Sequence, residues 1–173
     1  RRVNRLMREN DLLSPYRHAC EIKKKEHKGR IVQDHPNLLW GTDGKKFFVE
    51  SVGWGWFFAV IDHFNDEIIG WHICKRGTRW AAMEPVKAAV KKIFKSLDKG
   101  VCKGTWLKLR SDHGTQYDSD DFMKEMDYLG LDMSKAYVRS PECNGCIERF
   151  NRTINEEVFS IERFSSLEQA QRI

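Results

Sequence analysis

The stretch "TWLKLRSDHG" (residues 105–114) decides how this chain folds, because it carries an alternating apolar pattern straight into a carboxylate and a glycine. Alternation of apolar and polar residues predicts a β-strand with one buried face, so we expect a strand that ends at Asp112. Aspartate and glycine are also ordinary turn residues, and a turn alone explains this ending. The alternatives are a simple turn or a strand that delivers Asp112 to a site, and partners elsewhere in the chain must distinguish them.

Strand-like segments precede this stretch. Residues 38–43 ("LLWGTD") end on Asp43, and residues 45–51, 53–62 and 67–76 follow. All of them are rich in aromatic and β-branched side chains and are separated by glycine or by "HFND". The composition of these four segments together predicts three successive antiparallel strands. We place Asp43 at the end of the first strand.

Three helices are expected between and after the later strands. Residues 78–97 bring apolar side chains together every three or four positions, and residues 119–130 begin with acidic residues and end with glycine. Residues 131–138 then form a short fifth strand, and residues 144–159 form a last helix. The order of elements is βββαβαβα, in which the crossover helix favours parallel first and fourth strands. Sites in such sheets lie beyond the carboxyl ends of the parallel strands, so the two aspartates that end them are expected to meet there.

Length and composition limit the class of protein. The chain has 173 residues, of which 40% are apolar and 32% charged, enough for one core domain with short appendages. No apolar run approaches the roughly 18 residues that a membrane helix needs, and the opening "RRVNRLMREND" has no apolar signal segment. Five scattered cysteines favour reduced thiols in a cytoplasm over a disulfide framework. The chain opens without Met and stops in what looks like a helix start, so we expect a piece of a longer protein.

Positive charge is concentrated at the start of the chain. Residues 1–30 hold ten Lys or Arg and four Asp or Glu, a net charge of +6, whereas residues 31–173 hold 20 and 21, a net charge of −1. Such a basic arm either follows the phosphates of a nucleic acid or is a solvated linker, and charge alone favours neither. We divide the chain into a basic arm and linker, residues 1–34, and a core domain, residues 35–173, truncated at its C-terminus.

A third carboxylate lies 36 positions after Asp112. In the helix expected at residues 144–159, an arc of apolar residues forms the buried face: Ile147, Phe150, Ile154 and Val158. Glu148, Arg152 and Asn155 lie on a neighbouring flank, with Glu148 at the border of the buried face. Alone, Glu148 and Arg152 are best explained as a surface ion pair one turn apart. Three carboxylates without a Cys/His ligand set, however, suit a hard cation such as Mg²⁺.

Three strings of residues resemble the catalytic core of insertion-sequence transposases and retroviral integrases, the D,D-35-E group. They are "WGTD" (40–43), "SDHGTQY" (111–117) and "SPECNGCIERFNRTINEE" (140–157), and the resemblance covers about residues 36–160. It implies an α/β, RNase H-like fold, in which a five-stranded mixed sheet is flanked by helices. The first eleven residues resemble, more weakly, the end of the helix-turn-helix region that precedes the core in many of these transposases.

The resemblance also implies a function and further site residues. Asp43, Asp112 and Glu148 match the catalytic, metal-binding triad, with Mg²⁺ as cofactor and Mn²⁺ as its substitute. The implied reactions are nicking at DNA ends and attack of the freed 3′-hydroxyl on target DNA, catalysed by a homo-multimer of a bacterial, nucleoid-associated protein. Residues in and before the last helix match positions that face double-stranded DNA, that is, mobile-element ends and target: Asn144, Gly145, Arg152 and Asn155.

The chain departs from the family's pattern in two places. Cys143 and Cys146 stand where other residue types are usual, and "GTDGKKF" (41–47) is unusual after the first aspartate. A zinc site needs further ligands at matching spacing, and the His and Cys residues nearer the N-terminus do not provide them. A thiolate of lowered pKa at the helix start is a further alternative to variable loop residues.

Other candidate residues have simpler explanations. Asp62 competes for the first catalytic position, but its hairpin strand ends at the opposite end of the sheet, so we interpret it as a turn residue. Three aspartates are expected to cap the helix at residues 119–130: Asp118, Asp120 and Asp121. His113 is either a substrate contact or a solvent-facing side chain. Four tryptophans are expected in the core or on a sheet face, with base stacking as the alternative: Trp54, Trp56, Trp71 and Trp80.

The leading hypothesis is therefore a metal-dependent polynucleotidyl transferase that acts in transposition and DNA integration. One alternative is a related RNase H-like nuclease that cuts DNA without joining it. The other is a non-catalytic DNA-binding relic of a mobile element, and the intact triad argues against it.

Overall fold

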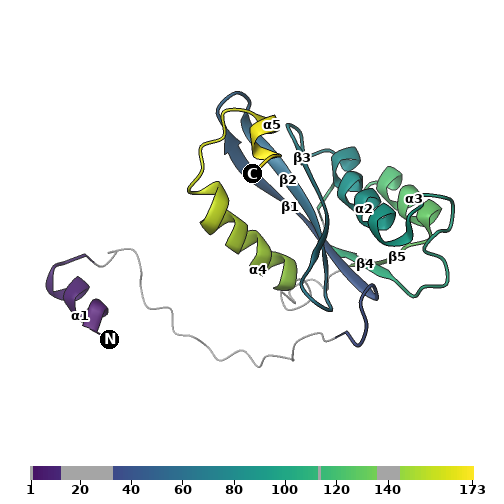
Figure 1. Ribbon diagram of the computed structural model, residues 1–173, viewed down its shortest axis with the longest axis horizontal. Helices are drawn as coiled ribbons and strands as arrows, with labels where there is room; N and C mark the ends of the chain where they lie inside the picture. Colours follow the sequence, from purple (N-terminus) through teal and green to yellow (C-terminus); the bar gives the residue numbers. More distant parts are fainter. Residues whose placement is uncertain (1, 13–32, 113, 136–144) are drawn as a thin grey trace.

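The structure is a computed structural model that describes residues 2–12, 33–112, 114–135 and 145–173 (Figure 1). A first helix, α1 (Arg2–Glu9), precedes the predicted order βββαβαβα, and a short helix, α5 (Leu167–Ala170), follows it. The division of the chain at residues 34 and 35 stays a prediction, because most of the arm lies outside the described residues. Within those residues, the structure contains no helix of the length and apolar character required to cross a membrane.

Five strands form one mixed sheet in the order β3-β2-β1-β4-β5, which confirms the predicted fold class. β1 (Leu39–Val49), β2 (Gly53–Asp62) and β3 (Ile68–Cys74) are antiparallel neighbours. β4 (Lys108–Ser111) runs parallel to β1, and β5 (Asp132–Lys135) runs parallel to β4. The helical crossover therefore makes the first and fourth strands parallel neighbours, as the element order predicts.

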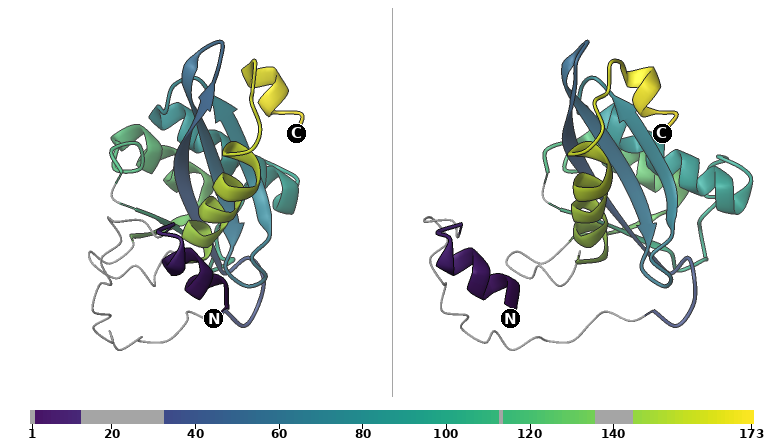
Figure 2. Two further views of the ribbon diagram at one scale, coloured as in Figure 1. Left: turned by 90° about the vertical axis from the view of Figure 1, so that its left-hand side faces the viewer. Right: turned by 60° about the vertical axis from the view of Figure 1, so that its left-hand side comes forward.

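Helices cover both faces of the sheet (Figures 1 and 2). α2 (Arg79–Phe94) and α3 (Asp120–Leu129) lie on one face, and α4 (Gly145–Ile154) lies on the other. For this reason β2 is buried on both faces, and its apolar run is continuous instead of alternating. Successive side chains of β2 enter the two halves of the core: Phe58 and Val60 lie on the side of α2 and α3, whereas Phe57, Ala59 and Ile61 lie on the side of α4.

Two elements differ in length from the prediction. β4 begins at Lys108 and not at residue 105, because the chain turns just before it: the Thr105 hydroxyl donates to the Cys102 carbonyl at 2.7 Å, and Trp106 takes a positive φ of 62°. α4 changes at Asn155 into a π-helix, η2 (Asn155–Phe159). β5 ends at the last residue described before the gap, so the predicted continuation to residue 138 lies outside the described residues.

The prediction that four tryptophans pack in the core or on a sheet face is only partly correct. Trp56 is partly buried and stacks on Phe58, with ring centroids 5.5 Å apart. Trp54 packs edge-on against Phe48 across the β1–β2 hairpin but is still 62% exposed. Trp71 is 48% exposed and projects from the edge strand β3, so it lies on the sheet and not in the core. Trp80 is 56% exposed in the first turn of α2, so the prediction of the core or a sheet face is wrong for Trp80.

The strand β3 touches the backbone of α2 at Gly70. A Cβ atom at this position would lie 2.1 Å from the carbonyl oxygen of Pro85 and 2.9 Å from the nitrogen of Ala89. Only glycine permits so close an approach of a strand to a helix backbone. This contact sets the distance between α2 and the sheet, since neither of the two backbone atoms belongs to a side chain that can rotate away.

Candidate active site

Asp43 projects from the middle of β1, so the prediction that it ends the first strand is wrong. The antiparallel register with β2 continues through Asp43, which lies opposite Ala59, and through Gly44, which lies opposite Phe58. The parallel pairing with β4, in contrast, stops at Gly41. Asp43 therefore lies just beyond the carboxyl end of the neighbouring parallel strand, where a site is expected, although its own strand continues.

Gly44 explains the unusual sequence after the first aspartate. A Cβ atom at Gly44 would lie 2.4 Å from the ring of Phe58, so this position has no room for a side chain. The Gly44 nitrogen donates to Asp43 Oδ1 at 2.7 Å. The glycine thus leaves space for an aromatic ring beside the aspartate and holds the carboxylate in place.

Asp112 directly follows the last residue of β4 and is exposed. The β1–β4 register pairs Gly41 with Arg110, and continuing it by two residues places Asp43 opposite Asp112. The nitrogen of Gly114 donates to Asp112 Oδ1 at 2.9 Å, so the turn after the strand holds the carboxylate. The two alternatives from the sequence, a simple turn and a strand that brings Asp112 to a site, therefore both describe this segment.

Glu148 comes from the first turn of α4 and is exposed. Its neighbour Ile147 is fully buried in the core on that side of the sheet, which places Glu148 at the border of the buried face, as predicted. Within the described residues, Glu148 and Arg152 form no ion pair with each other. Instead they line a hollow of about 370 Å³ with five other residues: Asp43, Gly44, Lys45, Asn151 and Asn155.

A second hollow, of about 150 Å³, adjoins the first and shares Asp43 and Gly44 with it. Asp112 lines this smaller hollow together with two aromatic side chains of β2 and two residues after β4: Trp56, Phe58, Gln116 and Tyr117. In the part of the chain that the structure describes, no three His, Cys, Asp or Glu side chains are close enough to hold one ion as a set. Asp43 thus borders both hollows, one together with Glu148 and the other together with Asp112.

The surroundings of Asp43 oppose its ionisation. The pKa of Asp43 is raised from 3.8 to about 6, chiefly because burial disfavours the charged form, and also because Asp112 and Glu148 carry like charges nearby. Hydrogen bonds from the Gly44 nitrogen and from Asn151 Nδ2 lower the pKa in part. Both other carboxylates are thus near enough to affect the charge of Asp43, and a cation would relieve this repulsion.

Replacing Asp43 by asparagine is expected to stabilise the metal-free protein at neutral pH. Since folding raises the pKa of Asp43, the folded state holds this proton more tightly, and stability falls as pH rises from about 4 through about 6. Asp43→Asn removes this loss, so urea unfolding in EDTA should show a gain of about 1–3 kcal/mol at pH 8 and none near pH 4. Added Mg²⁺ should stabilise the wild-type chain alone. Equal stability of the two proteins at pH 8 would contradict the raised pKa.

Asn151 is a site residue that the sequence analysis missed. It is 7% exposed, and its Nδ2 donates to Asp43 Oδ2 at 2.7 Å, which links α4 directly to β1. Its own Oδ1 is buried and has no hydrogen-bond partner among the described residues. The sequence does contain an indication of this role. Asn151 lies one turn after Ile147 on the predicted apolar face, where a polar residue is unusual and suggests a specific hydrogen bond.

The residues predicted to contact DNA are placed unevenly. Arg152 and Asn155 line the larger hollow with Glu148, and Gly145 is the first residue of α4, where a Cβ atom would meet no atom of a more distant described residue within 4 Å. Asn144 lies outside the described residues, as do Cys143 and His113. Cys146 is buried in the core under α4 and is not a surface thiol.

The competing aspartates have structural roles. Asp62 is 2% exposed and accepts hydrogen bonds from the nitrogens of Asn37 (2.8 Å) and Phe64 (2.9 Å), which confirms it as a turn residue. It lies opposite Trp40 in the β1–β2 register, three positions away from the Asp43 pair. Asp120 and Asp121 occupy the first turn of α3, after Ser119, whose side chain caps the helix.

Comparison with known proteins identifies the class. The model of the TnsB C-terminal domain family matches residues 46–163, a range that contains Asp112 and Glu148. The putative transposase InsD for insertion element IS2E of Escherichia coli K12 is 30% identical over 162 residues, covering 93% of this chain and 72% of that protein. Transposase InsD for insertion element IS2A/D/F/H/I/K of Escherichia coli is also 30% identical, and there the chain spans 52% of the relative.

Solved structures share the fold at low sequence identity. The catalytic domain of Mos1 mariner transposase has a TM-score of 0.61 at 11% identity, covering 79% of this chain and 67% of that one. The HTLV-2 integrase catalytic core domain in complex with magnesium has a TM-score of 0.53 at 17% identity, covering 70% and 68%. The fold is therefore the RNase H-like fold of integrase and transposase catalytic cores. The chain belongs to the TnsB C-terminal domain family and is a transposase of the integrase-core superfamily, so its function lies in DNA transposition and integration.

Proposed function

We propose that this chain carries the catalytic site of a DNA transposase, which nicks the ends of a mobile element and joins them to target DNA. The observation that supports this most is the arrangement of the three carboxylates. Asp43 from the middle of β1, Asp112 from the end of β4 and Glu148 from the first turn of α4 border two adjoining hollows that share Asp43. Carboxylates far apart in the sequence thus border one open surface.

Divalent metal ions fit this donor set. Three carboxylates offer only oxygen ligands, which Mg²⁺ and Mn²⁺ prefer, and two adjoining hollows that share Asp43 suit two ions. Asp43 would contribute to both ion sites, Asp112 to one and Glu148 to the other. When bound, the ions supply positive charge beside the attacking and leaving oxygens. The HTLV-2 integrase core is described with magnesium and the Mos1 catalytic domain with Mg or Mn, which supports the same cofactor here.

The two proposed reactions balance without further reactants. In the first, a water oxygen attacks a phosphodiester at the element end, and the 3′-oxygen leaves with a proton. In the second, that 3′-hydroxyl attacks a target phosphodiester and gives up its proton as the target's own 3′-oxygen leaves, so one bond forms as another breaks. The chain's own part is to hold the carboxylates, and Asn151 positions Asp43 for this through its 2.7 Å hydrogen bond.

Cationic and amide side chains beside the carboxylates suit a phosphate backbone. Lys45, Arg152 and Asn155 border the hollow that contains Glu148, and Gly145 leaves open space at the start of α4. We assign these residues, with Asn144, to contacts with mobile-element ends and target DNA. One structural neighbour is described as an intasome and another as trimeric, which supports a homo-multimer as the active form, associated with bacterial DNA.

Product analysis tests this function against a nuclease that only cuts. Labelled DNA that carries the element ends is incubated with the protein, Mg²⁺ and an unlabelled circular target. A transposase is expected to give labelled ends covalently joined to the target, whereas a nuclease gives only nicked donor. Nicked donor without joined product would contradict strand transfer, and absence of both would favour the non-catalytic relic.

A further inference from the structure

The core domain contains a local concentration of positive charge, although its net charge is close to zero. Residues 91–108 hold six lysines and one aspartate. They include the last turn of α2, its connection to β4 and the first residue of β4. The prediction that the basic character belongs to the N-terminal arm is correct for the net charge, which is −1 over residues 31–173. It does not describe how positive charge is distributed within the core.

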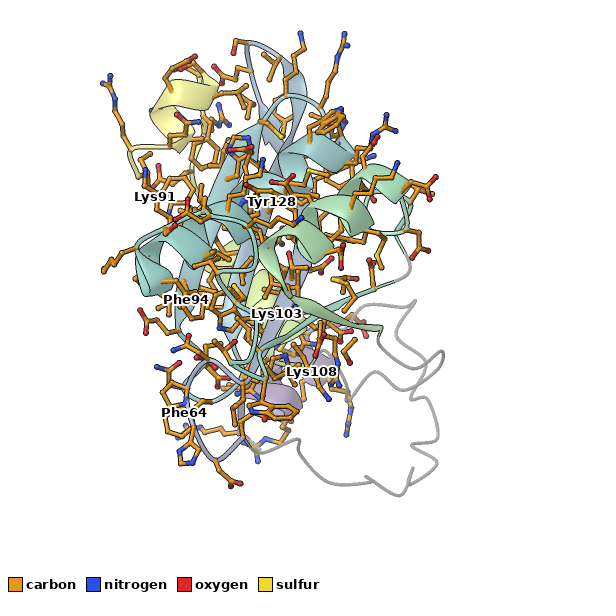
Figure 3. The ribbon with its side chains drawn as sticks, turned by 90° about the vertical axis from the view of Figure 1, so that its right-hand side faces the viewer. Phe64, Lys91, Phe94, Lys103, Lys108 and Tyr128 are labelled. Atoms are coloured by element: carbon orange, nitrogen blue, oxygen red, sulfur yellow. The ribbon has the colours of Figure 1, made fainter. Side chains whose placement is uncertain are left out.

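Three of these lysines lie on the side of the molecule that carries α2 and α3. Figure 3 shows Lys91, Lys103 and Lys108 there, together with the aromatic side chains of Phe94 and Tyr128. All three lysines are exposed, and none forms an ion pair with a described residue. The lysine side chains are thus available to an external anion.

Among the neighbours of Lys91 and Lys108 by helix spacing and strand register, one is a carboxylate. Lys87 on α2 and Lys95 at its C-cap lie four positions before and after Lys91, so neither of these neighbours is an acidic partner. Lys108 lies opposite Asp132 in the β4–β5 register, which offsets part of its charge. Lys87 and Lys92 differ from this group, because they pair with Glu125 at 3.1 Å and with Glu67 at 2.7 Å.

The connection between α2 and β4 is a rigid support for this surface. The Gly100 nitrogen donates to the Tyr128 carbonyl at 2.7 Å, and the Cys102 nitrogen donates to the Leu129 carbonyl at 2.9 Å, so the connection is fastened to the end of α3. Trp106 lies on the same connection and is 79% exposed, in a left-handed conformation with φ of 62° that is costly for a bulky residue. The fold therefore holds an indole ring in solvent next to a group of lysines.

We propose that Lys91, Lys103, Lys108 and Trp106, here called the lysine face, bind the phosphate backbone of a DNA duplex outside the active site. Lysines neutralise phosphates without reading sequence, and an exposed aromatic ring beside them packs on sugars or bases. Asp112 lies four positions after Lys108 along the strand, about 13 Å away, which is less than one turn of B-DNA at about 34 Å. The choice of DNA among polyanions rests on the proposed function.

A charge-matched pair of variants tests the lysine face. The test variant is Lys91→Gln/Lys103→Gln, and the control is Lys87→Gln/Lys92→Gln, whose lysines already have carboxylate partners. Each variant removes two positive charges and one lysine from the last turn of α2. Binding of a mixed-sequence duplex is measured against salt concentration in EDTA, where no nicking occurs. The test variant is expected to lower the slope of log K against log salt by about 2, with little change in the control.

Other outcomes would overturn the lysine face. An unchanged slope in the test variant, or an equal fall in both variants, would show that the face does not contact DNA. Loss of binding to anionic vesicles with unchanged DNA binding would assign the face to a membrane surface instead. A chain that joins DNA ends but lacks the slope change contradicts this proposal alone, whereas a slope change in a chain that neither nicks nor joins contradicts only the proposed function.

Discussion

Asp43→Asn, Asp112→Asn and Glu148→Gln are each expected to reduce nicking and strand transfer by about 10³-fold or more, equal to at least about 4 kcal/mol of activation free energy. The three substitutions keep the size of the side chain and remove one anionic oxygen ligand. Each carboxylate borders a hollow that contains Asp43, so the loss of any one of them weakens the proposed ion sites. Strand-transfer assays on labelled ends in Mg²⁺ measure the effect.

The three variants must still fold and bind DNA for this result to identify a site. Thermal unfolding and duplex binding in EDTA are expected to remain close to wild type or, for Asp43→Asn, to show higher stability. Glu157→Gln is the control, since Glu157 is an exposed acidic residue of η2 outside both hollows. Full activity of any triad variant, or a comparable loss in Glu157→Gln, would show that the chemistry lies elsewhere.

Gly70→Ala is expected to destabilise the fold by about 3 kcal/mol or more, although it adds only one methyl group far from the acidic surface. The new Cβ atom would lie 2.1 Å from the Pro85 carbonyl oxygen, so α2 must move away from β3. Because both opposing atoms are backbone, no change of rotamer relieves the contact. Thermal unfolding should show a fall of about 10 °C in Tm for a chain of this size.

Gly145→Ala is the matched control for Gly70→Ala. It makes the same chemical change at the first residue of α4, where the added Cβ would meet no atom of a more distant described residue within 4 Å. Alanine is the better helix former, so stability should stay the same or rise slightly. If Gly70→Ala were as stable as this control, the close approach of β3 to α2 would not exist in solution.

The element order and the three carboxylates were predictable from sequence because each depends on a local pattern. Alternation ends at Asp112, aromatic and β-branched segments mark the hairpin strands, and a helical arc places Glu148 at its border. The parallel neighbourhood of β1 and β4 follows from one general rule of chain handedness. The expected direction of the hairpin strands then set Asp62 apart from these carboxylates, and the structure gives Asp62 a separate, structural role.

The extent of β1 and the role of Asn151 depend on contacts that the local pattern does not contain. β1 continues past Asp43 because β2 pairs with it along its whole length and Gly44 makes room for Phe58. Asn151 becomes a site residue only when α4 packs across β1, 108 positions away in the chain. Trp71 and Trp80 are about half exposed, although both lie in apolar patterns that predict burial. Each of these features is set by tertiary packing, which propensity and periodicity do not encode.

The place of Asp43 within β1 has a consequence for ion selectivity. Its backbone lies in an antiparallel pairing with β2 that extends on both sides, whereas Asp112 stands at a strand exit and Glu148 in the first turn of a helix. A larger ion needs longer ligand distances, about 2.3–2.6 Å for Ca²⁺ against 2.0–2.1 Å for Mg²⁺. The sheet holds Asp43 at a fixed place, so in the proposed site the segments that carry Asp112 and Glu148 must make the whole adjustment. The stiffness of those two segments therefore sets how sharply the site discriminates between cations of different radius.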